Sequence, residues 1–435
     1  MKLLIKEGHV LDPVNKKDGI YDVMIEEGKI TKVGENIAES ADRIIAAKGC
    51  YVMPGFIDLH VHLRDPGLEY KETLATGGRA AAAGGVTTMC AMPNTKPVID
   101  TGEKVCQVHE RAQSESVVNI IQIGAVTVGQ EGQELADIAG MAAAGCHAIS
   151  EDGKSVMDVS LYRQAMKEAA ANKVAVFAHC EDINLVKGGV MNADGRAEEL
   201  GLNGITNEVE DVIIRRDIEL AKETGVRLHL CHCSTKASVE YLKRAKAEGL
   251  PVTGEVCPHH FTLTTADIPA DDGNYKMNPP LRRREDVEAL KEGLKHNVLD
   301  VIATDHAPHA LQEKNCSMKE AAFGIVGLET LAALTYTELV DSGVLTPMAM
   351  AEKMSYNPAH ILGLTKKGGV APEFDGDITI FDPTCEYKID KTTFASKGQN
   401  TPFHGRLVKG KVRYTIVDGQ VIFECHEDTA GGKDD

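Results

Sequence analysis

The pattern of hydrophobic and polar positions divides the chain into a long middle region and two shorter ends. In the middle, eight short apolar or β-branched runs are separated by segments of mixed polarity. The runs are 52–63, 86–92, 118–124, 145–150, 173–179, 226–232, 251–256 and 299–305. Strand and helix patterns that alternate eight times predict an α/β fold, a closed (β/α)8 TIM-type barrel.

Helical periodicity is clearest in three of the intervening segments, 161–171, 209–224 and 239–247. For the second of these, Asn207 is the predicted start signal and Gly225 the predicted stop signal.

Both ends of the chain are instead rich in short strand patterns. Residues 20–25 and 30–33 have strand character near one end, and 377–381, 412–417 and 421–423 near the other. Asp418-Gly419 is typical of a tight hairpin turn. We therefore expect a small β-sandwich domain built from residues 1–51 and 365–435, including a polar tail after Glu424, and a barrel domain over 52–364.

Polar side chains occur where the apolar runs of the middle region end. The carboxyl ends of barrel strands meet on one face, so residues far apart in sequence become neighbours there. Imidazole and carboxylate groups in such an arrangement match the number of ligands that two divalent metal ions sharing a carboxylate need. Zinc suits these ligands, with manganese or cobalt as substitutes. The candidate metal ligands are His60, His62, Asp152, His179, His232 and Asp305.

Simpler roles exist for several of these residues taken singly. Asp152 precedes a glycine and could belong to an ordinary turn, and Asp305 could cap the loop that follows it. Alternation along the sixth run places Cys231 and Cys233, together with His229, on the face opposite His232. We expect those three to pack toward the helices, although a thiolate metal site at the two cysteines is an alternative.

Three other histidines lie near strand ends. We expect His306 to support the site rather than to bind metal, and we expect supporting or structural roles for His259 and His260.

Composition narrows the classes of partner and the compartment. With 47 Lys+Arg against 65 Asp+Glu, the formal net charge is −18, which argues against nucleic acid or an anionic membrane as a partner. No apolar run approaches the roughly 18 residues that would cross a bilayer, and no signal-peptide pattern is present near residue 1. Eleven irregularly spaced cysteines indicate reduced thiols, so we expect a cytoplasmic protein.

Longer motifs resemble the type I dihydroorotases of the amidohydrolase superfamily, over nearly the whole chain. Residues 54–67 (PGFIDLHVHLRDPG) and 303–309 (ATDHAPH) are similar to the two signatures of that family. Residues 92–95 (MPNT), 278–282 (NPPLR) and 323–324 (FG) match as well.

This resemblance implies the reversible cyclisation of N-carbamoyl-L-aspartate to L-dihydroorotate in de novo pyrimidine (UMP) biosynthesis. It implies two zinc ions per subunit, one held by His60, His62 and Asp305 and the other by His179 and His232, with Asp152 bridging them. A hydroxide between the metals would be the nucleophile, and Asp305 the general acid and base. Many relatives bridge with a carboxylated lysine, whereas residues 149–153 carry the aspartate pattern of type I enzymes.

The substrate carries a carboxylate, which a guanidinium group can bind through two parallel hydrogen bonds. Arg64 lies two residues after His62 and is the candidate for this task, although a surface ion pair with Asp65 is the simpler interpretation. The resemblance assigns the remaining substrate contacts to His62, Asn94, Asn278, His309, Phe323 and Gly324.

Two alternative functions stay open. One is another cyclic-amide hydrolase, such as a hydantoinase, dihydropyrimidinase or allantoinase. The other is a non-catalytic barrel that acts as a scaffold for aspartate transcarbamoylase. The expected partner is the small-molecule substrate, and we expect a homodimer. Association with aspartate transcarbamoylase, which relatives of this family bind, stays open.

Overall fold

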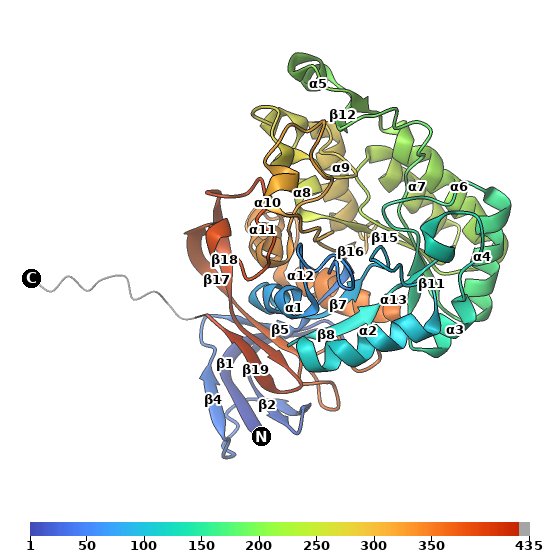
Figure 1. Ribbon diagram of the computed structural model, residues 1–435. Helices are drawn as coiled ribbons and strands as arrows, with labels where there is room; N and C mark the ends of the chain where they lie inside the picture. Colours follow the sequence, from blue (N-terminus) through green and yellow to red (C-terminus); the bar gives the residue numbers. More distant parts are fainter. Residues whose placement is uncertain (426–435) are drawn as a thin grey trace, which may run out of the picture.

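Each of the eight apolar runs contains a strand in the computed structural model, which describes residues 1–425 (Figure 1). All neighbouring strands of the barrel run parallel, in the order β6-β7-β8 and β9-β10-β11-β14-β15-β16. A parallel bridge between Val61 and His306 links the first strand to the segment after the last. The predicted barrel is therefore confirmed. Its strands are β6 (Phe56–Val61), β7 (Val86–Ala91), β8 (Asn119–Gln122), β9 (Gly124–Ala125), β10 (Ala148–Ser150), β11 (Ala175–Ala178), β14 (Leu228–Leu230), β15 (Val252–Val256) and β16 (Val301–Ile302). β8 and β9, one residue apart, are two parts of the third of the eight strands: the first part pairs with β7 and the second with β10.

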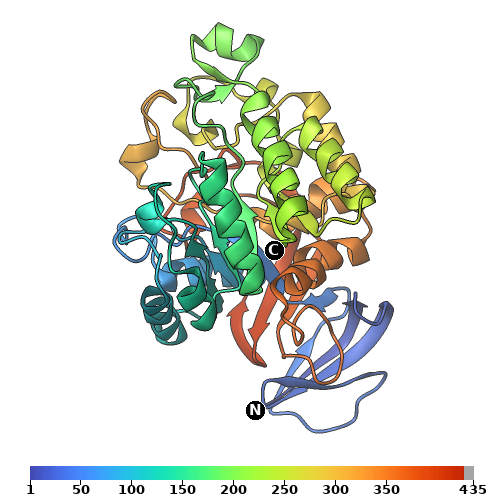
Figure 2. The same cartoon turned by 90° about the vertical axis from the view of Figure 1, so that its right-hand side faces the viewer.

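Helices cover the outside of the barrel, and Figure 2 shows the green ones standing side by side over it. The main helices are α1 (Leu74–Ala83), α2 (Gly102–Glu115), α3 (Ile138–Ala143), α4 (Val159–Ala171), α6 (Glu208–Thr224), α7 (Lys236–Ala247) and α9 (Arg284–Lys295). Shorter helices are α5 (Gly195–Leu200), α8 (Pro258–Thr262), α10 (Leu311–Lys314), α11 (Leu331–Thr335), α12 (Pro347–Ala351) and α13 (Asn357–Leu362).

The ends of α6 agree only in part with the predicted signals. Gly225 ends the helix with a φ of 71°, a left-handed conformation that glycine adopts without steric cost. Asn207 precedes the first residue, but its side chain does not cap the helix and donates to Asp286 at 3.1 Å instead.

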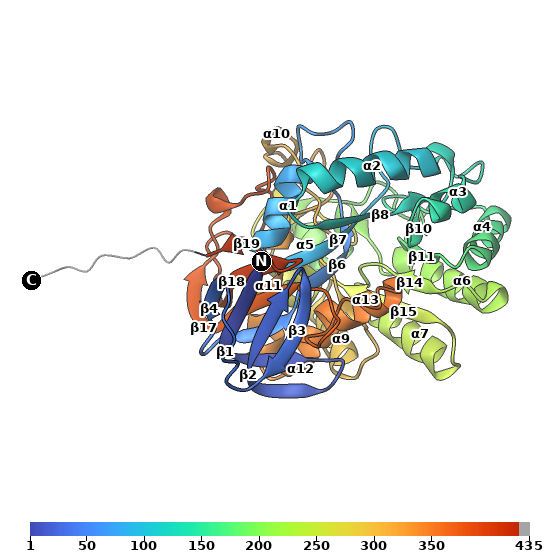
Figure 3. The same ribbon diagram turned by 90° about the horizontal axis from the view of Figure 1, so that it is seen from below.

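Strands from the two ends of the chain pair in one sheet, as Figure 3 shows from below. The order is β19-β18-β17-β5-β1-β2-β3, with β4 paired to β1, and their inward apolar side chains form a separate core. The strands are β1 (Lys2–Asp12), β2 (Lys17–Glu26), β3 (Lys29–Gly34), β4 (Arg43–Ala46), β5 (Tyr51–Pro54), β17 (Ile378–Lys388), β18 (Leu407–Val417) and β19 (Gln420–Glu424). A small pair, β12 (Met191–Asn192) with β13 (Gly204–Ile205), lies beside α5.

The first apolar run, 52–63, is divided between the two domains. Its beginning lies in β5, which pairs with β1 and β17, and its end forms β6 of the barrel. Gly55 stands at the division, and a Cβ there would come within 2.3 Å of the Thr87 side chain. The domain boundaries stay a prediction, and this pairing favours placing the first boundary after Pro54. The predicted polar tail beyond Cys425 lies outside the described residues.

Among residues 1–425, no helix combines the length and apolar character needed to cross a membrane.

Candidate active site

Six side chains from five strand ends converge at one mouth of the barrel. His60 is the last residue but one of β6 and His62 follows the strand, while Asp152, His179, His232 and Asp305 follow β10, β11, β14 and β16. His60 Nε2 lies 3.1 Å from Asp152 Oδ1, and His62 Nε2 lies 3.0 Å from Asp305 Oδ1. His179 Nδ1 lies 2.9 Å from His232 Nε2 and 3.6 Å from Asp152 Oδ1. The structure thus brings together all six predicted metal ligands.

Several of these polar atoms have no hydrogen-bond partner although they are buried. Two of them, His60 Nε2 and Asp152 Oδ1, face the cluster, and both residues are less than a tenth exposed. A third is His232 Nδ1, although Nε2 is the His232 nitrogen that faces His179 and Asp152. Leaving a buried polar atom without a hydrogen-bond partner destabilises the folded protein by about 1–3 kcal/mol. Several such atoms at one place therefore indicate that a ligand binds there. Four imidazoles around two carboxylates are the donor set of divalent metal ions such as zinc, and the residues fit that group.

The electrostatics of the cluster also favour a cation. Burial alone would raise the pKa of Asp152, but the nearby charges of His60 and His62 hold it well below its usual value. Burial alone would lower the pKa of His179, but hydrogen bonds to Asp152 and Glu181 raise it to about 10. The buried carboxylates therefore favour positive charge at this place.

Backbone turns at the strand ends aim two of these side chains, and Arg64 beside them, into the site. His232, Asp305 and Arg64 have φ values of 33°, 50° and 61°, which non-glycine residues rarely adopt. Such conformations cost on the order of 1–3 kcal/mol each and persist where the surrounding packing imposes them.

Because of this turn at His232, the prediction that His229, Cys231 and Cys233 all pack toward the helices is wrong for two of the three. His229 and Cys231 face the barrel interior, not the helices: His229 packs on Phe177 with ring centroids 4.9 Å apart, and Cys231 lies close to His60 and Glu255. Only Cys233 belongs to the core between barrel and helices. The strand ends at Leu230, so strict alternation stops before His232.

Glu255 lies next to the predicted metal ligand His60, and sequence reasoning missed it. It is fully buried on β15. Its Oε1 accepts hydrogen bonds from His60 Nδ1 at 2.8 Å and from the backbone N–H of His232 at 3.2 Å, while its Oε2 accepts from His229 Nε2 at 3.0 Å. A carboxylate on the second nitrogen of a ligating imidazole fixes its tautomer and orientation. The available signal was an acid inside an apolar run, where it is costly without a partner.

Asp58 and His306 support the same strands. Asp58 accepts hydrogen bonds from the backbone N–H groups of His60 and Thr304, both at 3.1 Å, and so ties β6 to the segment after β16. The His306 ring contacts Glu72 at 3.3 Å and accepts from the N–H of Gly327 at 3.2 Å. His306 therefore has the supporting position expected for it.

A pocket of about 330 Å³ opens over the cluster. Every predicted substrate residue lines it, namely His62, Arg64, Asn94, Asn278, His309, Phe323 and Gly324. Glu181, two residues after His179, also lines it and was missed; it accepts a hydrogen bond from Asn278 at 2.9 Å. The volume suits one small ring with a polar substituent.

Arg64 lines this pocket and does not form an ion pair with Asp65, because Asp65 has another partner. Asp65 pairs with Arg111 at 2.6 Å, which excludes the simple ion pair between neighbours. The Arg64 side chain donates to the carbonyl of Pro308 at 3.3 Å and lies 3.3 Å from His309 Nε2. Burial, and then the charges of Arg64 and Lys71, lower the pKa of His309 to about 2, so His309 is neutral.

The loop that carries His309 and Gly324 is held by Lys314 and Asn400, which match the family resemblance but to which the sequence assigned no role. The buried Lys314 ammonium donates to the carbonyls of Lys276, Ala322 and Gly324 at 2.7–2.9 Å. Asn400, from the segment between β17 and β18, accepts from the N–H of His309 and donates to the carbonyl of Gly324, both at 3.1 Å. The small β domain's polypeptide thus reaches the pocket.

A parallel barrel with imidazole and carboxylate ligands at its strand ends defines a metal-dependent hydrolase of the amidohydrolase class. Solved structures of that class share the fold: the chain superposes on an L-hydantoinase from Arthrobacter aurescens with a TM-score of 0.88 and 27% identity, over 98% of this chain and 96% of that one. A dihydropyrimidinase from Brevibacillus agri gives 0.86 and 23%, over 98% and 95%.

Comparison of the sequence identifies the family more specifically than the similarity of the solved structures does. Residues 49–238 match the model of the dihydro-orotase-like family. The chain is 48% identical to a dihydroorotase from Pelotomaculum thermopropionicum over 98% of this chain and 99% of that protein, and 47% identical to one from Ligilactobacillus salivarius over 98% and 100%. The chain belongs to the dihydroorotase family, and it is a hydrolase that acts on a cyclic amide. Membership implies the use of divalent metal ions.

Proposed function

We propose that the protein catalyses the reversible cyclisation of N-carbamoyl-L-aspartate to L-dihydroorotate, with a small molecule as its substrate. The observation that carries this function is the combination of Asp152 among four imidazoles with Arg64 in the pocket above them. A neutral ring, as in a hydantoin, would need no guanidinium group beside it.

The proposed cofactor is a pair of zinc ions per subunit. His60, His62 and Asp305 would hold one ion, His179 and His232 the other, and Asp152 would bridge them. When bound, two such ions lower the pKa of a shared water and polarise the carbonyl oxygen under attack. Glu255 and Asn94 orient the ligands: Asn94 Oδ1 lies 3.0 Å from His62 Nδ1, and Asn94 Nδ2 lies 3.4 Å from Asp152.

Asp305 is the proposed general acid and base. It is buried, and it faces the pocket beside His62. Burial alone would raise the pKa of Asp305, but the hydrogen bond from His62 and the charge of His60 lower it, so Asp305 is held in the ionised form that a general base needs. In ring opening it would take the proton of the attacking water and deliver it to the leaving ring nitrogen; in ring closure the transfers reverse.

The substrate carboxylate would be bound by Arg64, Asn94 and His309, and the ring amides by Asn278 and the backbone of Phe323 and Gly324. Gly324 has a φ of 126°, and a Cβ there would lie 2.5 Å from that of Ala307, so only glycine fits this wall of the pocket.

The first experiment compares ring opening of L-dihydroorotate and of dihydrouracil by purified protein, with a chelated sample alongside. Turnover of L-dihydroorotate alone, lost on chelation and restored by zinc, is the expected result. Turnover of dihydrouracil would instead favour a hydantoinase-like enzyme, and no turnover of either substrate with metal bound would favour a scaffold.

Replacing Asp305 with asparagine tests its proton transfer. We expect activity to fall by about 10²–10⁴-fold, the usual contribution of a positioned acid or base. Metal content, measured in the same preparations, separates lost proton transfer from lost metal. Asp217→Asn is the control, since Asp217 is an equally buried carboxylate paired with Arg216 on α6. Near-normal turnover of Asp305→Asn would contradict the role.

The quaternary structure and location are also proposals. The family resemblance supports a homodimer, association with aspartate transcarbamoylase and a cytoplasmic location. Sedimentation of the protein alone and mixed with aspartate transcarbamoylase tests the first two, and fractionation of cells tests the third.

A further inference from the structure

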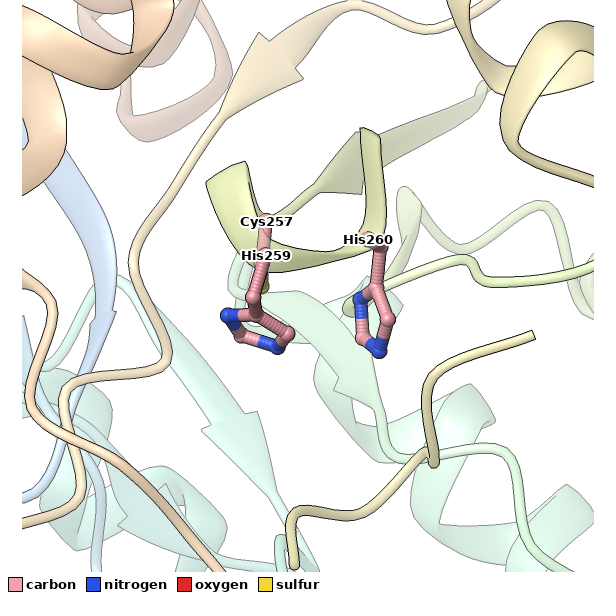
Figure 4. Close-up of side chains that lie close together, drawn as sticks. All are labelled: Cys257, His259 and His260. Carbon is pink, nitrogen blue, oxygen red and sulfur yellow. The ribbon is translucent and has the colours of Figure 1, made fainter. Parts of the chain in front are cut away.

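A second group of possible metal ligands lies outside the set described above. Cys257, His259 and His260 lie at the end of β15 and in the first turn of α8 (Figure 4). One ligand atom from each lies within 4.8 Å of the others, and none of the three residues is more than 2% exposed. Figure 4 shows the two rings side by side below the turn, with Cys257 behind His259, and their centroids are 4.2 Å apart.

The hydrogen bonds of His260 leave one nitrogen facing the cluster without a partner. His260 Nε2 donates to the carbonyl of Pro279 at 2.9 Å, so the neutral ring carries its lone pair on Nδ1. That Nδ1 is buried and unpaired, and so is Nε2 of His259. A backbone carbonyl on the other ring nitrogen is the usual outer partner of a metal-ligating histidine.

The protonation states suit a metal ion as well. Burial lowers the pKa of His259 to about 4 and that of His260 well below its usual value, so both rings are neutral, as ligands must be. Burial raises the pKa of the Cys257 thiol, but a coordinating cation deprotonates a thiol outright.

We propose that Cys257, His259 and His260 bind a zinc ion separate from the pair at the barrel mouth. A thiolate with two imidazoles is a donor set that selects zinc among the common divalent ions, and a water molecule would complete a tetrahedral site. Through the hydrogen bond of His260 to Pro279, the ion would steady the segment that presents Asn278 to the pocket. This site does not depend on which cyclic amide the enzyme acts on.

Cobalt substitution tests the site directly, because the ligands proposed for the metal pair contain no sulfur. Metal-free full-length protein is titrated with Co²⁺ while the near-ultraviolet thiolate-to-cobalt absorption is recorded and the bound metal is counted. We expect this absorption in the wild-type protein, with three rather than two cobalt ions bound per chain at saturation. Absence of the absorption in the wild type would overturn the proposal without any variant.

Two matched cysteine variants identify the sulfur. Cys257→Ser should abolish the absorption and lower the count from three ions to two, whereas Cys231→Ser should keep both. Cys231 is the matched control because it is equally buried and lies near His60 and Glu255. The opposite pattern would assign the sulfur to Cys231 and refute the proposal. If Cys257→Ser does not fold, His259→Asn is used instead, and we expect it to lose the thiolate-to-cobalt absorption and one bound ion as well. Retention of the full absorption in His259→Asn would count against the site.

Discussion

Replacing Glu255 with glutamine removes one negative charge from beneath the predicted metal ligands and changes almost nothing in shape. The carboxylate now accepts from His60 Nδ1, His229 Nε2 and the backbone of His232 at 2.8, 3.0 and 3.2 Å. A glutamine has only one acceptor oxygen, and its NH₂ group cannot accept. One of the two imidazole N–H groups must therefore lose its partner or change its tautomer.

The size of the effect follows from these contacts. A hydrogen bond to a charged group contributes about 1.5–3 kcal/mol, and the bond to His60 is the one that orients a predicted ligand. Loss of an outer partner of this kind usually weakens metal binding by about 10–100-fold. At about 1.4 kcal/mol per factor of ten, this corresponds to roughly 1.4–2.8 kcal/mol, which agrees with the hydrogen-bond value.

The assay is a competition between the protein and a chromophoric chelator for zinc, with the fold checked by circular dichroism. Glu210→Gln is the control, because Glu210 is also a buried glutamate and accepts from the Ser234 N–H at 2.9 Å without contacting a predicted ligand. We expect weaker zinc binding in Glu255→Gln and unchanged binding in Glu210→Gln. A folded Glu255→Gln variant with wild-type zinc affinity would refute the reasoning.

Three further outcomes are expected. Arg64→Gln should raise the KM for L-dihydroorotate by about 10–100-fold, because a charge-assisted pair worth about 1.5–3 kcal/mol is lost. The metal content should stay unchanged. An unaltered KM in steady-state kinetics would contradict the binding of the substrate carboxylate by Arg64. Lys314→Met leaves three buried carbonyls without their donor, so we expect a loss of about 3 kcal/mol or more in the free energy of unfolding, measured with urea, and a lower kcat/KM because Gly324 is released. The third concerns pH: the folded protein keeps His309 neutral, with a pKa lowered to about 2 by burial and then by Arg64, whereas the unfolded chain takes up a proton near pH 6.5. The unfolded state therefore binds more protons below that pH, so the free energy of unfolding of the wild-type protein should fall by up to about 1.4 kcal/mol per pH unit on acidification. Urea titrations between pH 7 and 5 should show a shallower decline for His309→Gln than for the wild type. An equal decline in the two proteins would contradict the neutral state assigned to His309.

The sequence by itself determined where the barrel strands lie and which polar residues end them. Strand and helix patterns can be found locally, because the buried side chains of one element recur along the sequence at the regular spacing of that helix or strand. Once eight parallel strands are expected, the carboxyl ends of all of them must meet, and so His60, His179 and Asp305 could be placed together without a structure. Arg64 could be placed near them for the same reason.

Only the tertiary structure decided how side chains point beyond the last regular residue of a strand and which distant segments support them. Cys231 shares the barrel interior with His229, and His232 nevertheless reaches the site because its own backbone takes a left-handed conformation that packing imposes and alternation cannot foresee. Glu255 and Asn400 act through hydrogen bonds to residues 195 and 91 positions away. No local pattern encodes such pairs, since their stability depends on the burial and geometry of the whole assembled barrel rather than on the residues next to them.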